Sequence, residues 1–186
     1  MSKNIVILSG SPRKGGNTDL LVEAFKDGAE SAGKSVALFR VADMKIGGCT
    51  GCEYCLTKEK AVCFQKDDMP QILDALREAD AMVLASPVYY FNVTAQLKLA
   101  IDRIYAISSA EKRIKRAALL MTCADADSGT AKGALGMFEN WIEYQNAHFE
   151  PKWENAGILI VTGVHKGGAI AGRDELGQAI ALGREI

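Results

Sequence analysis

Five short apolar segments recur along the chain, and turn-forming residues bound each of them. They lie at residues 5–8, 36–39, 82–85, 117–121 and 158–161. Val, Ile, Leu and Ala fill these segments without a strict alternation of polar residues, which is typical of strands that are covered on both faces. The pattern therefore predicts five buried strands.

Segments with the spacing of amphipathic helices separate and follow these strands. Their apolar positions are Leu20, Leu21, Ala24 and Phe25; Ile72, Leu73, Leu76 and Ala79; Leu97, Ala100, Ile101 and Ile104; Leu135, Phe138, Trp141 and Ile142; and Leu176, Ile180 and Ala181 in a last helix. Each interval exceeds the dozen or so residues that a parallel crossover needs. We therefore predict an α/β protein with a three-layer flavodoxin-like fold and a five-stranded parallel sheet of order 2-1-3-4-5.

Length and composition indicate one globular domain over residues 1–186. Hydrophobic residues make up 48% of the chain and charged residues 24%, which excludes intrinsic disorder. A net charge of -1 provides no general field for nucleic acid or for an anionic membrane. No apolar run approaches the roughly 18 residues of a membrane span. We expect a cytoplasmic protein without nucleic-acid or membrane partners.

A polar, glycine-containing loop, SGSPRKGGNT at residues 9–18, follows the first strand and leads into the first helix. Glycines allow tight turns, hydroxyl and amide groups donate hydrogen bonds, and a helix N-terminus attracts anions. The loop matches neither G-x-x-x-x-G-K-[ST] nor G-x-G-x-x-G. It predicts a site for a phosphate monoester; the alternative is a plain turn capped by Asn17 or Thr18.

The run GSPRKGGNTDLL and the later run SPVYYFNVTAQLKLAIDR together resemble the NAD(P)H-dependent FMN reductase family of flavodoxin-like oxidoreductases. The resemblance implies noncovalently bound FMN, NAD(P)H as co-substrate, and reduction of flavin, quinone or related small-molecule acceptors by a ping-pong mechanism. It places Ser9, Ser11, Arg13, Asn17 and Thr18 around the FMN phosphate, and Pro87, Val88, Tyr89, Tyr90, Phe91 and Asn92 along the isoalloxazine ring. Cys123, Asp125 and Gly129 are expected on the far side of the ring.

FMN itself carries the chemistry in such enzymes, so no catalytic side chain is expected. We expect His148 and His165 at the surface or at helix ends. Asp67 and Asp68 precede Met-Pro and are expected as a helix cap and a first-turn acid. At least one ring of the aromatic run at 87–92 is expected in the core or at a subunit interface instead of against flavin.

Four of the five cysteines, Cys49, Cys52, Cys55 and Cys63, lie in an insertion at about 47–66. Their Cys-x2-Cys-x2-Cys-x7-Cys spacing reproduces the first three ligands of a ferredoxin-type run, and it resembles the iron–sulfur flavoprotein branch of the same family. A [4Fe-4S] cluster, a structural zinc ion and a metal-free thiol loop are all compatible with the spacing. Cys123 is expected as a buried residue at a strand end.

The helix after the third strand has more apolar positions than one inward face requires. They are Leu97, Leu99, Ala100, Ile101, Ile104, Tyr105 and Ile107. With the family resemblance, this surplus predicts a homodimer or homotetramer. A second hypothesis for function is an electron carrier that exchanges electrons with a ferredoxin-like partner; a redox-sensing module is a third.

Overall fold

The structure is a computed structural model that describes residues 4–57, 62–108 and 113–186. Its strands are β1 (Asn4–Ser9), β2 (Ser35–Arg40), β3 (Ala81–Pro87), β4 (Arg116–Thr122) and β5 (Glu154–Val161). Its α-helices are α1 (Asn17–Ser31), α2 (Met69–Glu78), α3 (Ala95–Ile104), α4 (Lys132–His148) and α5 (Asp174–Glu185). Short 3-10 helices lie at η1 (Val41–Asp43), η2 (Tyr54–Thr57), η3 (Tyr105–Ile107) and η4 (Ser128–Ala131).

The five strands form one parallel sheet of order β2-β1-β3-β4-β5. The registers place Leu8 of β1 opposite Leu84 of β3, and Leu84 opposite Leu119 of β4. All three are fully buried, because helices cover both faces of the sheet. The predicted fold class and strand order are confirmed. The expectation that all five strands are buried is wrong for the edge strands β2 and β5, which are half-buried or exposed along most of their length.

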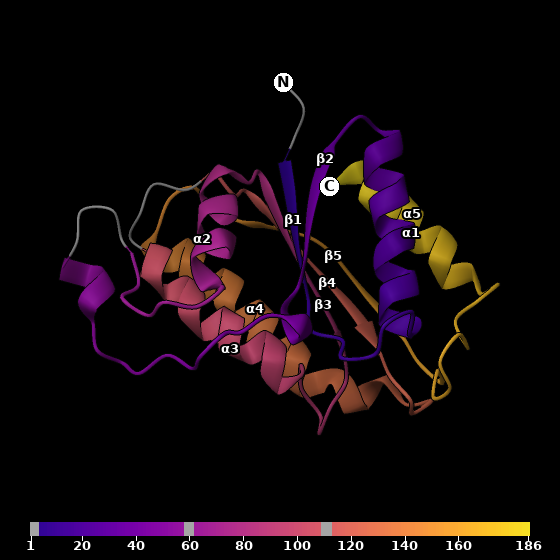
Figure 1. The fold of residues 1–186 in the computed structure, drawn as a ribbon. Coiled ribbons are helices and arrows are strands. Elements are labelled where there is room, and N and C mark those ends of the chain that lie inside the picture. Colours follow the sequence, from indigo (N-terminus) through magenta and orange to yellow (C-terminus); the bar gives the residue numbers. More distant parts are fainter. Residues whose placement is uncertain (1–3, 58–61, 109–112) are drawn as a thin grey trace.

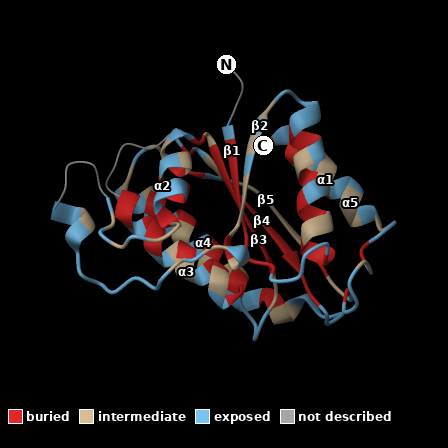
Figure 2. Ribbon diagram, in the orientation of Figure 1, coloured by how far each residue is buried: buried red, intermediate tan, exposed pale blue. Residues whose placement is uncertain are grey.

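Figure 1 shows the three layers, with α1 and α5 on one face of the sheet and α2, α3 and α4 on the other. Alternate residues of a strand point to opposite faces. Val6 and Leu8 of β1 accordingly join the core under α2, α3 and α4, while Ile5 and Ile7 join the core under α1 and α5. The buried residues in Figure 2 follow the sheet and the inner sides of the helices.

Two glycines allow α1 and α5 to pack backbone against backbone. A Cβ added to Gly28 of α1 would overlap the carbonyl of Ile180, and one added to Gly183 of α5 would overlap the carbonyl of Phe25. Both glycines are buried. No helix in the described ranges is long and apolar enough to cross a membrane.

Candidate functional site

The loops that leave β1, β3 and β5 meet residues at the end of β4 around a hollow of about 190 Å³. We call it the phosphate hollow. Its lining comprises Ser11, Arg13, Gly16, Asn17, Thr18, Pro87, Val88, Tyr89, Thr122, Ala124, Val164, His165 and Gly167. It lies where ligands bind in open α/β sheets, outside the carboxyl ends of the strands.

The N-terminus of α1 forms one wall of the phosphate hollow. Gly16 is the N-cap residue and makes no side-chain cap, so the expected capping by Asn17 or Thr18 is wrong. The first N–H groups of a helix have no partner within it, and here they are at the edge of the hollow. Gly15 has a φ of 65°, and its N–H donates to Asp19 at 2.8 Å, which fixes the turn before the helix. This wall suits an anion.

Two of the side chains expected to contact phosphate serve a different purpose. The Asn17 amide donates to the carbonyls of Val164 at 2.9 Å and Lys166 at 2.8 Å, and its oxygen accepts from the N–H of Ile170 at 3.2 Å. The Thr18 hydroxyl lies 2.7 Å from that of Thr122. Both side chains therefore join neighbouring segments, and the polar atoms of the Asn17 amide are all engaged in these contacts.

Ser9 is separated from the other four expected phosphate contacts. It is the last residue of β1, it is buried, and its Oγ has no hydrogen-bond partner in the described part of the chain. It lines a neighbouring hollow together with Lys14, Asp19 and Arg40. Ser11, which lies beyond the strand end, lines the phosphate hollow instead.

The aromatic loop after β3 forms a second wall of the phosphate hollow with Pro87, Val88 and Tyr89. Backbone hydrogen bonds between Tyr89 and Asn92 close a tight turn. At its tip Tyr90 is 98% exposed and Phe91 63%, and both have positive φ, 47° and 67°. Such conformations are uncommon for aromatic residues and cluster at binding sites.

Cys123, Asp125 and Gly129 do not line the phosphate hollow. Cys123 is buried with its Sγ 2.8 Å from Thr130 Oγ1, which matches its expected buried position at the strand end. Asp125 accepts from the N–H of Asp127, and Gly129 donates its N–H to Asp127. The hollow is lined instead by the alternate residues Thr122 and Ala124, because neighbouring side chains at a strand end point in opposite directions.

The segment after β5 is a part of the site that the sequence reasoning missed. Val164, His165 and Gly167 line the phosphate hollow; His165 is exposed, as expected, and it also lies at the site. Arg13 approaches the carbonyl of His165 at 3.5 Å. The available signal was the glycine-containing run GVHKGG directly after a strand. His148, by contrast, lies in the last turn of α4, 4.4 Å from the ring centre of Tyr144.

Comparison with known proteins agrees with this geometry. The model of the NADPH-dependent FMN reductase family matches residues 3–152. The chain belongs to that family. An iron–sulfur flavoprotein of Archaeoglobus fulgidus is 46% identical over 95 residues, which is 51% of this chain and 42% of that protein. One of Methanosarcina thermophila is 26% identical over 150 residues, 76% of this chain and 78% of that protein.

The chain spans about half the length of the first curated relatives that it matches. Among solved structures, an NAD(P)H:quinone oxidoreductase from Methanothermobacter marburgensis superimposes with a TM-score of 0.70 at 20% identity, covering 99% of this chain and 96% of that one. This likeness shows the shared fold. The resemblance of the sequence to the family and to its iron–sulfur branch is confirmed.

The cysteine-containing loop lies away from the phosphate hollow. After η1 the chain runs along α3 towards its C-terminal end, as the purple trace in Figure 1 shows. Its four cysteines all line one hollow of about 210 Å³, together with Arg103 and η3 residues. Thr94 caps α3 and binds the Gly10 carbonyl at 2.8 Å, whereas Arg103 near the other end binds Gly47. The backbones of Thr94 and Arg103 are about 14 Å apart along the helix axis, at 1.5 Å per residue.

The surroundings of the four thiols differ. Cys49 and Cys52 are exposed, whereas Cys55 and Cys63 are partly buried. Burial raises the pKa of Cys55, and so do the nearby sulfurs of Cys63, Cys49 and Cys52. A backbone hydrogen bond from Tyr54 and the hydroxyl of Thr50 lower the pKa of Cys52. Over residues 4–57, 62–108 and 113–186, no three such side chains are arranged at ligating distance.

The two ends of the cysteine loop are joined by polar contacts. Asp68 donates its N–H to the Lys45 carbonyl at 2.9 Å and accepts from the Lys45 N–H at 2.7 Å. Asp67 accepts from the N–H of Gly47 at 2.9 Å and from that of Met69 at 3.1 Å. Asp67 thus caps α2, whereas Asp68 is the N-cap residue by position and makes no side-chain cap. The expected helix cap is therefore provided by Asp67. The expected first-turn acid is wrong, because neither aspartate lies in the first turn of α2.

Arg103 completes this junction from α3. It donates to the Gly47 carbonyl at 2.9 Å and to both carboxylate oxygens of Asp67 at 2.8 and 3.1 Å. Burial lowers the pKa of Arg103, but Asp67 and the adjacent Cys63 raise it more. In Asp67 burial raises the pKa, and the bonds from Arg103, Gly47 and Met69 lower it more. Sequence reasoning had assigned no role to Arg103.

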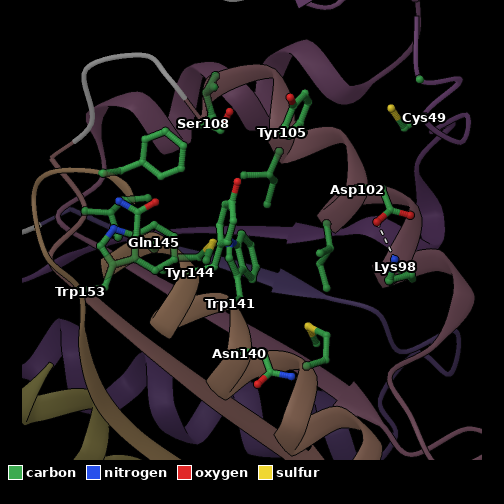
Figure 3. A pocket seen from close by; sticks show the side chains of 18 residues that line it. Cys49, Lys98, Asp102, Tyr105, Ser108, Asn140, Trp141, Tyr144, Gln145 and Trp153 are labelled. Carbon is green, nitrogen blue, oxygen red and sulfur yellow. Dashed lines mark hydrogen bonds and ion pairs between the residues drawn. The ribbon is translucent and has the colours of Figure 1, made fainter. Parts of the chain in front are cut away.

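A larger apolar hollow of about 840 Å³ lies between α3 and α4, bordering the cysteine loop (Figure 3). Trp141 and Trp153, with ring centres 5.6 Å apart, form much of its wall. Ile101 and the half-exposed Tyr105 of the α3 side face it, and Cys49 lies on its rim. Four of the α3-side residues that suggested a surplus, Leu97, Ala100, Ile104 and Ile107, are buried, whereas Leu99, Ile101 and Tyr105 are not.

Proposed function

We propose that this protein is an FMN-dependent NAD(P)H oxidoreductase that reduces flavin, quinone or related small-molecule acceptors by a ping-pong mechanism. The observation that carries the proposal is the phosphate hollow, where the free N–H groups of α1 face the loops after β3, β4 and β5. Membership of the FMN reductase family supports it. Bound FMN would accept a hydride from NAD(P)H and pass the electrons on.

The residues at the hollow suggest how FMN would be held. The N–H groups at the start of α1, the hydroxyl of Ser11 and the guanidinium of Arg13 would bind the phosphate. The turn at Tyr89–Asn92 presents aromatic rings and amide groups on which the flavin ring would pack. These groups orient the cofactor and exclude water; no acid or base is required of the chain.

Cofactor extraction and steady-state kinetics test this proposal. We expect the purified protein to contain flavin and to release FMN, not FAD, on denaturation. The reason is that the hollow offers one helix N-terminus, which suits a single phosphate group. Initial rates with NAD(P)H and a quinone should give the parallel double-reciprocal lines of a ping-pong cycle. FAD in the extract would refute the cofactor assignment. Intersecting lines would refute the mechanism.

We further propose that Cys49, Cys52, Cys55 and Cys63 hold a [4Fe-4S] cluster. All four line one hollow, and thiolates are the ligands of such clusters. Gly51 and Glu53 have φ values of 65° and 56°, so the loop bends between successive cysteines. The names of the relatives, iron–sulfur flavoproteins, support this assignment. Iron, sulfide and zinc analysis after anaerobic reconstitution tests it; zinc at one per chain, or no metal, would refute it.

The cluster makes a second function worth testing, that of an electron carrier with a ferredoxin-like partner. The feature that favours it is the exposure of Cys49 and Cys52, which leaves this side of the hollow accessible to a partner protein. Reduction of the protein by ferredoxin, at a rate that NAD(P)H does not match, would select the carrier. Faster reduction by NAD(P)H than by ferredoxin would favour the reductase.

A homodimer or homotetramer is our third proposal. Ile101 and Tyr105 leave apolar surface on the outer side of α3, next to the hollow between α3 and α4. A second copy on this surface would bring its own phosphate hollow towards the cysteine loop, which a single chain keeps at the far end of α3. Light scattering at micromolar concentration tests the assembly. A cytoplasmic location is proposed as well, because all five cysteines are free thiols.

A further inference from the structure

Arg103 is the most deeply buried charged side chain near the cysteine loop. Its side chain is 1% exposed, while that of its partner Asp67 is 14% exposed. A buried charge is retained only where close partners compensate its lost hydration. Arg103 lies in the last turn of α3. The partners that compensate its charge therefore indicate its role.

Two of the three nitrogens of the guanidinium join the ends of the cysteine loop. Nη1 donates to the Gly47 carbonyl, where the loop starts, and Nη1 and Nη2 both donate to the Asp67 carboxylate, where it ends. This two-pronged contact depends on the planar fork of arginine, which lysine lacks. These contacts hold the two ends of the loop together.

The third nitrogen has no such partner. Nε of Arg103 is buried and makes no hydrogen bond to any residue in the ranges 4–57, 62–108 and 113–186. Arg103 lines the same hollow as the four cysteines, and Cys63 lies beside its guanidinium. A buried donor without an acceptor costs free energy, and a thiolate next to it would be a suitable acceptor.

We propose that Arg103 is a positioning residue of the cysteine centre, which closes the loop through Gly47 and Asp67 and donates its Nε–H to the Cys63 thiolate, thereby raising the reduction potential of the centre. The inference rests on the iron–sulfur cluster proposed above. Reduction adds an electron to an already anionic cluster, so a nearby positive charge and a hydrogen bond to sulfur stabilise the reduced form more than the oxidised form.

The test is an anaerobic redox titration of reconstituted protein, with iron, sulfide and FMN contents measured on the same samples. Arg103→Lys keeps the charge but loses the fork. The double variant Arg103→Gln with Asp67→Asn removes both charges and leaves neither one unpaired. Arg113→Gln is the matched control, because Arg113 is an exposed arginine whose partner is Glu78 at 3.1 Å.

We expect the cluster potential to fall in both Arg103 variants, with the double variant shifted at least tenfold in its reduction equilibrium, or about 59 mV for one electron. FMN content and the potential of Arg113→Gln should not change. Full iron and sulfide occupancy with an unchanged potential would overturn the role of Arg103 while the cluster proposal stands. If the unmodified protein assembles no cluster, the cluster proposal fails and this inference fails with it.

The variants can also lose the cluster altogether while keeping FMN. Amide exchange of the metal-free protein then decides the outcome. The N–H of Gly47 donates to Asp67 at 2.9 Å. Faster exchange of this N–H in the variants than in the unmodified protein supports loop closure by Arg103. Exchange as slow as in the unmodified protein would overturn it.

Discussion

The side-chain amide of Asn17 lies 2.9 Å from the carbonyl oxygen of Val164, and this contact joins the first helix to the loop after the last strand. A second donation to Lys166 and an acceptance from Ile170 use the rest of the amide. Asn17 is thus a connector between two walls of the phosphate hollow, and its importance does not depend on touching the ligand.

Replacing Asn17 should therefore reduce stability even without FMN. We expect Asn17→Ala to lower the free energy of unfolding of the apoprotein by about 1–3 kcal/mol, because buried polar groups lose their partners. Ser11→Ala is the comparison: its hydroxyl makes only contacts of 3.3–3.4 Å with Arg13. It should leave apoprotein stability nearly unchanged and weaken FMN binding by about 1–2 kcal/mol. Urea denaturation and fluorescence titration with FMN measure the two effects; equal stabilities of the two apoproteins would contradict the connector role.

Substitutions of Tyr90 should affect the stability of the fold and the binding of FMN in different ways. Its φ of 47° disfavours any Cβ, and the residue is 98% exposed. We expect Tyr90→Gly to be more stable than Tyr90→Ala by about 1 kcal/mol, because the two variants differ mainly in the strain of that Cβ. If the ring packs on flavin, both should bind FMN equally weakly. An FMN affinity unchanged from the unmodified protein would remove Tyr90 from the site.

The close approach of α1 and α5 makes Gly183 sensitive to a single methyl group. Gly183→Ala should destabilise the fold by about 1–3 kcal/mol, because its Cβ meets the Phe25 carbonyl and the backbones must move apart. Gly177→Ala on the same helix is the control, since no heavy atom lies within 4 Å of the added Cβ. That change should stabilise the fold by about 0.5–1 kcal/mol. Thermal unfolding in which both variants shift the same way would contradict the packing argument.

Serine substitutions separate the two candidate sites. Changing any one of Cys49, Cys52, Cys55 or Cys63 should strip iron and acid-labile sulfide yet leave FMN bound, because the hollow that the cysteines line shares no residue with the phosphate hollow. Cys123→Ser is the matched control, since a serine hydroxyl can keep the contact with Thr130. Its metal content should not change. Loss of FMN together with iron would show that the sites are coupled.

The Arg103–Asp67 pair predicts a specific acid sensitivity. The pKa of Asp67 is depressed in the folded chain, so its stabilising contribution is present above the unfolded value of about 3.8 and is lost as the pH falls through the folded pKa. At pH 7 Asp67→Asn should cost about 3 kcal/mol, because it leaves Arg103 buried without its counter-charge. The difference from the unmodified protein should shrink below about pH 3.8. Urea midpoints at several pH values measure this, and a difference that is independent of pH would contradict it.

The fold was predictable because each strand is a short apolar run bounded by turn residues, although only β1, β3 and β4 are buried along most of their length. The local motifs of the site were visible too: Ser11, Arg13 and Tyr89 all lie at the phosphate hollow. What one sequence does not contain is the direction of each side chain at a strand end. Side chains alternate along β4, so either Thr122 or Cys123 can face the phosphate hollow, but not both. Which of them does so depends on where β4 ends.

The remaining differences come from contacts between distant segments. The amide of Asn17 reaches a loop about 150 residues away in sequence, and Arg103 reaches the ends of a loop that precedes its own helix. The path of the cysteine loop along α3 is of the same kind. These three features depend on how the helices pack in space, and the spacing of residues along the sequence does not encode that packing.

The paired contacts of Lys45 and Asp68 mean that the chain leaves the fold and returns to it at nearly one point. Between them, Gly47 and Asp67 bind Arg103 at the two ends of the cysteine loop, and neither β2 nor α2 has to move when the segment between Gly47 and Asp67 changes in length. A chain in which only residues 48–66 are replaced by a short turn would keep Gly47 and Asp67 as the partners of Arg103, and with them its sheet, its helices and its phosphate hollow. The cysteine loop is in this sense a removable module, one that could be transplanted to another flavodoxin-like scaffold together with an arginine at the equivalent turn of α3.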